Sequence, residues 1–516
     1  MLICQTLWSA KKNLLEENFG WYTPQHHLMG WALSALKLSQ HYDTVRLYTD
    51  NAGKEMLVDR MGIPYTDVFT DYDNLNCPPE LWAFPKLLTY ERQDRPFLHV
   101  DGDVMVWKPF SNDFLTEELL AQNLERGTQH YKGLFEPIIN ELAYMPPCLE
   151  RNLNFDDMRA YNAGIIGGSD VSFFKKYVSL AKRFIEANSN RKVNIAFNAM
   201  FEQLLFFSMA ENEKKKVACL FDQIIDDNGY SNEVFANFTK VEKLGYLHLI
   251  GPFKRSKEVC DWMARYLRRE NEEMFLKIID LFKQNYYFSA NTTRIINNKA
   301  ERNEIIGFRY HRSEKLARSI DPTFVSGSNR QLDKHIARSQ NTFLKELFKY
   351  EKRIHRIYNK FKKMTISFLE KTDDDMMYSM RFLSYENDKR WNVRLFRNPY
   401  AEIIHTAYDW PGMKISPDST VSIRCSDNKD IIVGIAPDLF FPGYREVALD
   451  ETCVNIMVLT EGPLSYNDLI SKVRDLFPPF KNEKEHEGLC ELTFLKVGFL
   501  IQNKLIFIHE GDNENT

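Results

Sequence analysis

The sequence predicts an α/β protein in which a mostly parallel sheet is flanked by helices, followed by a smaller α+β region. Short apolar runs alternate with helical patterns through the first hundred residues, and this alternation is typical of crossover connections between parallel strands. One apolar run, residues 97–100, ends directly in Asp101-Gly102-Asp103. Because open α/β sheets bind ligands at the carboxyl ends of their strands, this segment also indicates where a ligand would bind.

Size and composition narrow the class of protein. A chain of 516 residues with 44% hydrophobic residues is long enough for two or three folded domains. Its net charge of −4 argues against a protein that binds nucleic acid. The eight cysteines are dispersed without a Cys-x-x-Cys pair, which favours a cytoplasmic protein over a disulfide framework or a zinc site. The apolar run at 492–508 is interrupted by Lys496 and Lys504, so we expect no transmembrane segment, and no signal peptide is evident.

The elements before residue 97 follow from periodicity. Apolar runs predict buried strands at 2–8, 44–48 and 65–69. Helical patterns follow them at 24–41, 51–61 and 85–91, because apolar residues recur there at the three- and four-residue spacing of one helix face. Residues 97–100 are predicted as the central strand. After it, residues 104–107 form a second apolar run and 113–150 are predicted to be mainly helical. The rest of this part is predicted as a strand at 161–168, helices at 171–188 and 195–210, and strand and loop at 240–253.

We expect a first domain at residues 1–290, a basic helical connector at 291–364 and an accessory α+β domain at 365–516. Within the connector, 291–339 are polar with little periodicity, and 340–363 predict a helix rich in Lys and Arg. We interpret this charge run as a solvated helix face, with contact to an anionic surface as the alternative. The accessory domain is predicted from short β-like runs at 366–369, 391–396, 402–407, 420–424, 430–435 and 504–508, helices at 447–458 and 465–477, and a helix or strand at 492–500.

Asp101 and Asp103 are the first candidate ligands for a metal ion. Two residues apart in an extended strand, their side chains point the same way, and two carboxylates together with phosphate oxygens of a substrate are a common way to hold Mg2+ or Mn2+. The sequence has two other Asp-x-Asp triplets, at 71–73 and 373–375. We interpret those as solvated turns, because only the central triplet lies between two apolar runs.

Three further clusters bear on the same chemistry. In His248-x-x-Gly251-x-x-Lys254, the imidazole is a suitable third ligand, the glycine allows the backbone to approach a phosphate, and the lysine supplies positive charge. The second cluster is Asn162-Ala163-Gly164. The third is the polar pair Glu202-Gln203 in an apolar helical pattern. Taken singly, these clusters are also compatible with a structural histidine, a strand end and an exposed helix face.

Taken together and in this order, the clusters resemble the pattern of GT-A glycosyltransferases, in particular the retaining family that includes glycogenin and the lipopolysaccharide galactosyl- and glucosyltransferases. That family has an apolar strand ending in Asp-x-Asp, then Asn-x-Gly, an Asp-Gln pair and His-x-x-Gly-x-x-Lys. The resemblance covers about the first 260 residues, and it implies a Rossmann-like mixed sheet flanked by helices. The last of the four motifs is the most specific.

The resemblance also implies roles for individual residues. Asp101, Asp103 and His248 would bind Mn2+ or Mg2+, which holds the diphosphate of a nucleotide-sugar donor, by family default a UDP-sugar. The donor site would further include Lys86, Gly102, Gly251 and Lys254. Gln203 would lie beneath the anomeric carbon, with Glu202 and Asn162 as further catalytic residues. Two departures, Glu202 in place of Asp and Arg255-Ser256 in place of Pro-Trp, leave the sugar and the retaining outcome open.

The carboxyl-terminal part, residues 445–510, resembles winged-helix modules of the PqqD kind more loosely. The resemblance rests on residues 447–452 and 462–469, each followed by a helical pattern, with 492–508 as a wing. PqqD-like modules bind leader peptides by adding the peptide as an edge strand. The resemblance therefore implies a peptide acceptor, and a purely structural winged helix is the alternative.

We therefore expect a metal-dependent glycosyltransferase that moves a sugar from a nucleotide-sugar to a hydroxyl of a peptide or glycan acceptor. One alternative is a transferase for a surface polysaccharide or a lipid-linked sugar, with peripheral membrane contact through the basic helix. Another is a non-catalytic binding protein that keeps the GT-A-like fold.

Overall fold

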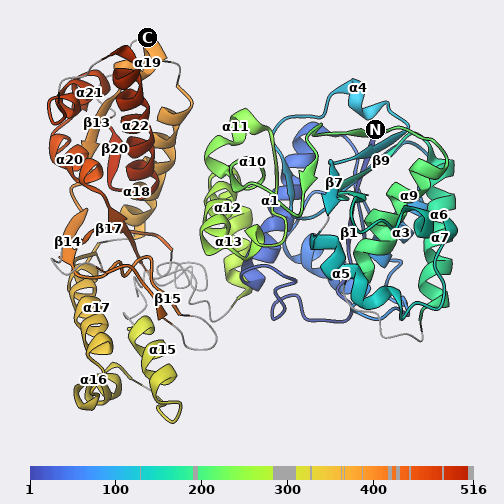
Figure 1. The fold of residues 1–516 in the computed structure, drawn as a ribbon, viewed down its shortest axis with the longest axis horizontal. Coiled ribbons are helices and arrows are strands. Elements are labelled where there is room, and N and C mark those ends of the chain that lie inside the picture. Colours follow the sequence, from blue (N-terminus) through green and yellow to red (C-terminus); the bar gives the residue numbers. More distant parts are fainter. Residues whose placement is uncertain are drawn as a thin grey trace. The chain divides into compact units, whose positions relative to one another are not determined.

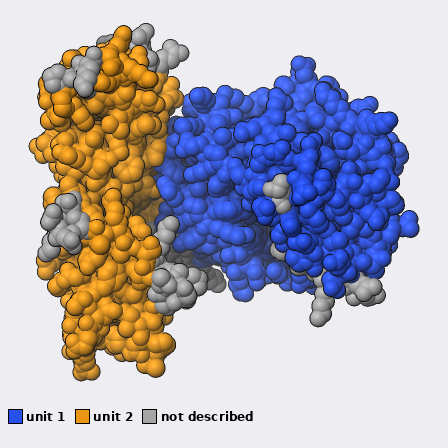
Figure 2. All heavy atoms as spheres, viewed as in Figure 1, with its two compact units in different colours: residues 1–282 blue, residues 283–516 orange. Residues whose placement is uncertain are grey.

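The computed structural model describes residues 1–127, 129–189, 196–282, 310–325, 328–361, 363–364, 366–385, 387–415, 421–425, 431–440, 443–478 and 482–509. The chain forms two compact units, residues 1–282 and 283–516, which are coloured separately in Figure 2. None of the described helices combines the length and the apolar character that crossing a membrane requires.

Unit 1 is built on a seven-stranded mixed sheet with the order β10-β6-β9-β4-β1-β2-β3. Strands β1, β2, β3 and β4 pair in parallel, β6 and β10 also pair in parallel, and β9 runs antiparallel to both β4 and β6. The fold is therefore α/β, and it is compatible with the expected Rossmann-like arrangement. The strands are β1 (Leu2–Leu7), β2 (Val45–Thr49), β3 (Asp67–Phe69), β4 (Phe97–Val100), β6 (Leu119–Ala121), β9 (Ile165–Gly168) and β10 (Val217–Cys219).

Both faces of this sheet are buried. In β1, Cys4 packs in one hydrophobic cluster with helices α3 (Phe84–Glu91) and α7 (Val171–Ala187), whereas Ile3 packs in a second cluster with α1 (Pro24–His41). Figure 1 shows α1 on one side of β1 and α3 and α7 on the other. Burial on both faces explains why the predicted strands are almost continuously apolar.

The helices around this sheet begin at residues suited to capping. Helix α1 has Thr23 at its N-cap, whose hydroxyl accepts from the backbone N–H of His26, and Pro24 at its first position. The predicted helices at 24–41 and 85–91 are confirmed. The predicted helix at 51–61 is a short α2 (Asn51–Lys54) continued by the π-helix η1 (Glu55–Arg60). Unit 1 ends in two further helices, α12 (Lys257–Glu270) and α13 (Glu272–Leu281).

The central strand β4 leads into the segment that carries the aspartates. After Asp103 the chain leaves the large sheet as β5 (Val104–Val106), which pairs antiparallel with β12 (Tyr246–His248) so that His248 lies opposite Val104. The backbone N–H of Leu249 donates to the carbonyl of Asp103 at 2.9 Å. This small sheet brings the His248 segment to the end of the central strand.

The prediction for 113–150 is wrong in part. This stretch contains β6 and β7 (Leu124–Gly127) besides helices α4 (Asn112–Leu115), α5 (Gln129–Ile139) and α6 (Pro147–Asn152). A strand as short as β6 has too few residues for an alternating pattern, and neighbouring strands supply its stability. The strand predicted at 161–168 is two strands, β8 (Met158–Tyr161) and β9, separated by Asn162, Ala163 and Gly164. The helix predicted at 195–210 is α8 (Phe197–Ala199), π-helix η2 (Met200–Leu204) and α9 (Leu205–Asn212).

Unit 2 includes all described residues of the expected connector. Helices α15 (His311–Ile320), α16 (Asn329–Arg338) and α17 (Thr342–Phe361) share a hydrophobic core with β14 (Glu402–Thr406) and β17 (Ile431–Pro437). The boundary expected near residue 364 therefore falls within this unit. Three lysines of α17, Lys349, Lys352 and Lys360, pair with nearby carboxylates, as expected of a solvated helix face.

Two of the secondary-structure predictions for unit 2 are corrected by the structure. The β-like run at 366–369 begins helix α18 (Ile366–Ser379), because its apolar residues continue at helical spacing through Leu369 and Met376, both of them buried. The segment predicted as a helix from 447 begins in strand β18 (Tyr444–Leu449), and helix α20 (Glu451–Leu459) starts only after the N-cap Asp450. Asp450 accepts from the backbone N–H of Cys453, which ends the strand and starts the helix.

The carboxyl-terminal part of unit 2 combines two small antiparallel sheets with three helices. The sheets have the orders β14-β17-β18 and β19-β13-β20. Helices α20, α21 (Tyr466–Arg474) and α22 (Glu483–Gln502) contact one another. The strands of the second sheet are β13 (Arg394–Arg397), β19 (Leu464–Ser465) and β20 (Ile506–Ile508).

A buried ionic cluster joins distant parts of unit 2. The ammonium group of Lys504 is fully buried and lies 2.8 Å from Oδ1 of Asp373 and 3.1 Å from Oδ1 of Asp438. Arg445 contacts the other oxygen of Asp438 at 2.9 Å. The third Asp-x-Asp triplet is therefore not a solvated turn, since Asp373 lies in helix α18 and is buried.

Replacing Lys504 by Met removes the cation that Asp373 and Asp438 share. Two buried carboxylates then lose the ammonium group between them, although Asp438 keeps its contact with Arg445. We expect unit 2 to lose about 3–5 kcal/mol of unfolding free energy. Thermal or urea denaturation followed by circular dichroism measures this loss. Lys484→Met, at an exposed position on the same helix α22, is the matched control and should change stability little. Equal stability of the two variants would contradict the assignment.

Candidate metal centre and adjoining pocket

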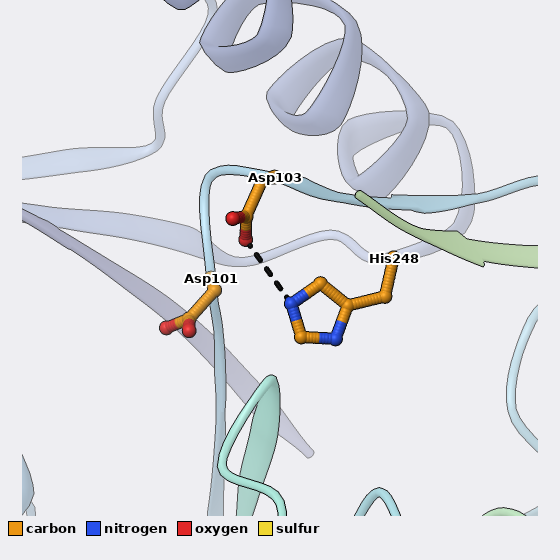
Figure 3. A group of neighbouring side chains, drawn as sticks. All are labelled: Asp101, Asp103 and His248. Carbon is orange, nitrogen blue, oxygen red and sulfur yellow. Dashed lines mark ion pairs between the residues drawn. The ribbon is translucent and has the colours of Figure 1, made fainter. Parts of the chain in front are cut away.

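Asp101, Asp103 and His248 come together at the end of the central strand. One ligand atom from each can be chosen so that all three lie within 4.8 Å of one another. Nε2 of His248 lies 3.4 Å from Oδ1 of Asp103, and Figure 3 shows this carboxylate directed toward the imidazole. The structure thus brings together the three residues that the sequence predicts as metal ligands.

The loop that carries the aspartates is held by its backbone. Asp101 donates its N–H to the carbonyl of Gly164 at 2.9 Å, and Val104 donates to the carbonyl of Asp101 at 3.1 Å. The ring of Trp31 lies against Gly102. A Cβ at this position would be 2.5 Å from Cε2 of Trp31, so a larger residue would not fit without movement of the ring. The indole therefore fixes the turn between the two carboxylates.

Each aspartate has its own lysine. Nζ of Lys86 lies 2.8 Å from Asp101, and Nζ of Lys254 lies 2.7 Å from Asp103. Burial would raise the pKa of Asp103, but the positive charge of Lys254, with His248, holds that pKa well below its usual range. Burial raises the pKa of Asp101 against the opposing effect of Lys86. An ammonium group thus lies against each of the two carboxylates.

Glu202 lies behind Lys86. Its Oε1 is 2.5 Å from the same ammonium group, and its side chain is 1% exposed. Burial raises the pKa of Glu202 to about 7, although Lys86 acts in the opposite direction. Gln203 is half-buried in the same π-helix η2. Neither residue is among the described residues that line the pocket beside the aspartates.

Asn162 and Gly164 support His248. The side chain of Asn162 accepts from the N–H of Gly164 at 2.9 Å and donates to Glu125 at 2.8 Å. A Cβ on Gly164 would lie 2.3 Å from Cε1 of His248. The Asn-x-Gly motif is therefore needed for close packing of the imidazole against the backbone, and Asn162 orients this turn from outside the pocket.

Lys254 is delivered by a short loop after His248. Gly251 is half-buried and has a φ of +43°. This backbone conformation favours glycine. The carbonyl of Lys254 accepts from the N–H of Tyr22 at 2.8 Å. The backbone of the loop is thus tied to the amino-terminal segment, while the ammonium group reaches Asp103.

A cavity of about 550 Å³ adjoins the aspartates. Its wall combines the charged groups of Lys86, Asp101, Asp103 and Lys254 with a set of aromatic side chains. The aromatic residues are Trp8, Phe19, Trp21, Trp31 and Trp82. A concave site that combines aromatic faces with convergent charged groups is suited to a charged organic ligand.

Sequence reasoning missed Gln122 and Asn123. Both side chains are fully buried, and Oε1 of Gln122 lies 2.6 Å from Nδ1 of His248. The available signal was an adjacent pair of amides directly after the apolar run 119–121. Because that run was predicted as helical, its carboxyl end was not recognised as a strand end.

Lys254 would compete with a metal ion for Asp103, which gives a direct test. In Lys254→Met the competing ammonium group is absent, so we expect Mn2+ alone to bind several-fold more tightly than to the wild type. Electron paramagnetic resonance of free Mn2+ measures this affinity. Lys257→Met is the matched control, because Lys257 pairs with Asp261 at 2.7 Å. Unchanged or weaker Mn2+ binding by Lys254→Met would show that the lysine and the ion do not share Asp103.

Comparison with known proteins identifies the family but no activity. The model of a family described as "Family of unknown function (DUF6734)" matches residues 1–281, which is more than half of the chain and almost all of unit 1. A search of curated proteins finds no match. The residues of the candidate metal centre all lie within the matched part. The chain belongs to the DUF6734 family, a family of unknown function.

Proposed function

We propose that this protein is a metal-dependent glycosyltransferase that moves a sugar from a nucleotide-sugar, by preference a UDP-sugar, to an acceptor hydroxyl. The observation that carries the proposal is the convergence of Asp101, Asp103 and His248 at the end of the central strand, beside a cavity of about 550 Å³. Ligand binding at strand ends is typical of open α/β sheets. The order of motifs along the chain supports the same activity.

The three side chains fit Mn2+ or Mg2+. Two carboxylates and one neutral imidazole suit Mn2+ in particular, and they leave coordination positions for phosphate oxygens. When bound, the ion would stabilise the negative charge that develops on the departing diphosphate. The ammonium groups of Lys86 and Lys254 would also attract an anionic ligand to this region.

Lys254 is the residue best placed to act on the leaving group. Its ammonium group lies 2.7 Å from Asp103 on a loop anchored through its backbone, so a small side-chain movement would transfer it to a phosphate oxygen. Lys86 stays between Asp101 and Glu202 and holds both carboxylates in place. The aromatic wall offers flat apolar faces on which a nucleobase or a sugar ring can stack.

We further propose that the reaction retains the configuration of the sugar. In that case the acceptor hydroxyl approaches from the face that the diphosphate leaves, and the departing phosphate accepts the hydroxyl proton. This reaction needs no strong side-chain nucleophile. The resemblance assigns the position beneath the anomeric carbon to an amide, Gln203, which is not among the residues that line the cavity.

The acceptor is proposed to be a peptide selected by the PqqD-like part of unit 2. Strand β18 is at the edge of the sheet β14-β17-β18 and pairs, among the described strands, with β17 alone. A cavity of about 290 Å³ next to it is lined by Leu449, Asp450, Lys496 and Phe499 among others. An edge strand beside a pocket suits an added peptide strand. The alternative, a lipid-linked or polysaccharide acceptor at a membrane, relies on the cations of α17, of which Lys349, Lys352 and Lys360 are already paired.

A thermal-shift panel of nucleotide-sugars with and without Mn2+ tests the donor. We expect the largest rise in Tm with a UDP-sugar and Mn2+ together, since a ligand at one hundred times its Kd stabilises by about 2.7 kcal/mol. Asp103→Asn should abolish this rise and any hydrolysis of the donor. The control Asp71→Asn alters the exposed Asp-x-Asp triplet, where Asp71 pairs with Arg92, and should behave as wild type.

The outcomes of this panel separate the hypotheses. A shift with donor and Mn2+ but no turnover of any donor would favour the non-catalytic binding protein. Absence of a shift with every nucleotide-sugar would contradict the proposal as a whole.

A second experiment tests the acceptor. We expect the protein to bind a fluorescent peptide encoded beside its gene and to remain in the supernatant with phosphatidylglycerol vesicles. Val447→Pro in β18 should weaken peptide binding, because proline removes a backbone donor from the strand. Sedimentation with the vesicles, without peptide binding, would favour the membrane alternative.

A further inference from the structure

A chain of buried amides lies on the side of His248 that faces away from Asp103. Nδ1 of His248 is 2.6 Å from Oε1 of Gln122, and Nε2 of Gln122 is 2.9 Å from Oδ1 of Asn123. Nδ2 of Asn123 is 3.1 Å from the carbonyl of Leu124. The proposed glycosyl transfer uses neither amide, yet both are fully buried.

The orientation of both amide groups follows from the last hydrogen bond of the series, which Asn123 makes with the carbonyl of Leu124. A backbone carbonyl can only accept a hydrogen bond, so the group of Asn123 that faces Leu124 is its NH2. The oxygen of Asn123 then faces Gln122 and requires the NH2 of Gln122 as donor. The oxygen of Gln122 is therefore the atom that faces His248, and it can only accept.

The consequence for His248 is a defined tautomer. Because Oε1 of Gln122 accepts from Nδ1–H, Nδ1 carries a proton, and Nε2 is the nitrogen whose lone pair can bind a cation. Nε2 is the nitrogen that lies 3.4 Å from the carboxylate of Asp103. A divalent cation between them would be bound by both the imidazole and the carboxylate.

We propose that Gln122 is a positioning residue that holds the His248 ring in the tautomer and orientation that present Nε2 to a divalent cation. The inference rests on the metal centre of the proposed function and adds a residue to it. Gln122 does not touch the cation and acts through the imidazole.

Gln122 itself is held in place from several directions. Tyr246, which precedes His248 by two residues in β12, donates its hydroxyl to the same Oε1 at 2.5 Å. The backbone N–H of Gln122 donates to the carbonyl of Asn162 at 3.2 Å, and its carbonyl accepts from Phe221 at 2.9 Å. A Cβ on Gly164 would lie 2.8 Å from the amide oxygen. The absence of a side chain at Gly164 therefore makes room for both the ring and the amide.

The test measures Mn2+ binding to the full chain by electron paramagnetic resonance, with three variants. Gln122→Met keeps the size of the side chain and removes the acceptor, and we expect a 10- to 100-fold loss of Mn2+ affinity. Gln122→Glu keeps an acceptor at the same place and should restore affinity to within a few-fold of wild type. Tyr246→Phe removes the other donor to Gln122 and should leave Mn2+ affinity nearly unchanged.

A spectroscopic readout separates positioning from a purely structural role. In 15N-histidine-labelled protein without metal, the His248 signal, identified by its loss in His248→Ala, should show Nδ1 protonated in the wild type and in Gln122→Glu. In Gln122→Met it should change toward Nε2 protonation.

The outcomes are distinguishable. If the wild type does not bind Mn2+, the metal centre and the proposed function fail together. If the wild type binds Mn2+ and Gln122→Met binds it equally well, or if its His248 tautomer is unchanged, only the role of Gln122 is overturned. A loss of affinity in Tyr246→Phe as large as in Gln122→Met would likewise overturn it, because general loosening would then explain both.

Discussion

Unit 1 depends on the neutralisation of two neighbouring carboxylates. Asp101 and Asp103 follow a fully buried strand, so their repulsion is weakly screened and must be balanced locally. The structure balances it with Lys86 and Lys254, which arrive from a helix before the strand and from a loop far along the chain. A buried charge that loses its partner is strongly destabilising. Each lysine therefore links the acidic pair to another part of unit 1, helix α3 in one case and the loop after His248 in the other.

The same requirement explains how the chain is routed. Immediately after Asp103 the chain leaves the large sheet and pairs with β12, and this pairing places His248 on the third side of the acidic pair. Two glycines allow close packing at this centre. A side chain at Gly102 would collide with Trp31, and a side chain at Gly164 would collide with His248. The shape of the centre therefore depends on the ion pairs, on the pairing of β5 with β12 and on these two glycines.

Much of this could be predicted from the sequence, but only where the signal is local. The long helices, the longer strands and the grouping of Asp101, Asp103 and His248 follow from periodicity and from the order of motifs. Strand β6 could not be predicted, because three residues carry no period and the sheet supplies their stability. Gln122 was missed for the same reason, since its role arises from a segment more than one hundred residues away. Helix α18 was mistaken for a strand because a four-residue apolar run fits both.

The match to the family ends almost where unit 1 ends, at residue 281 beside the unit boundary at 282. Every residue of the acidic centre, its lysines and its amide support belongs to that unit. Recombination that replaced unit 2 by another fold would therefore leave the centre chemically complete. The side chains that form the centre are thus all encoded in the first half of the chain, whichever fold follows them.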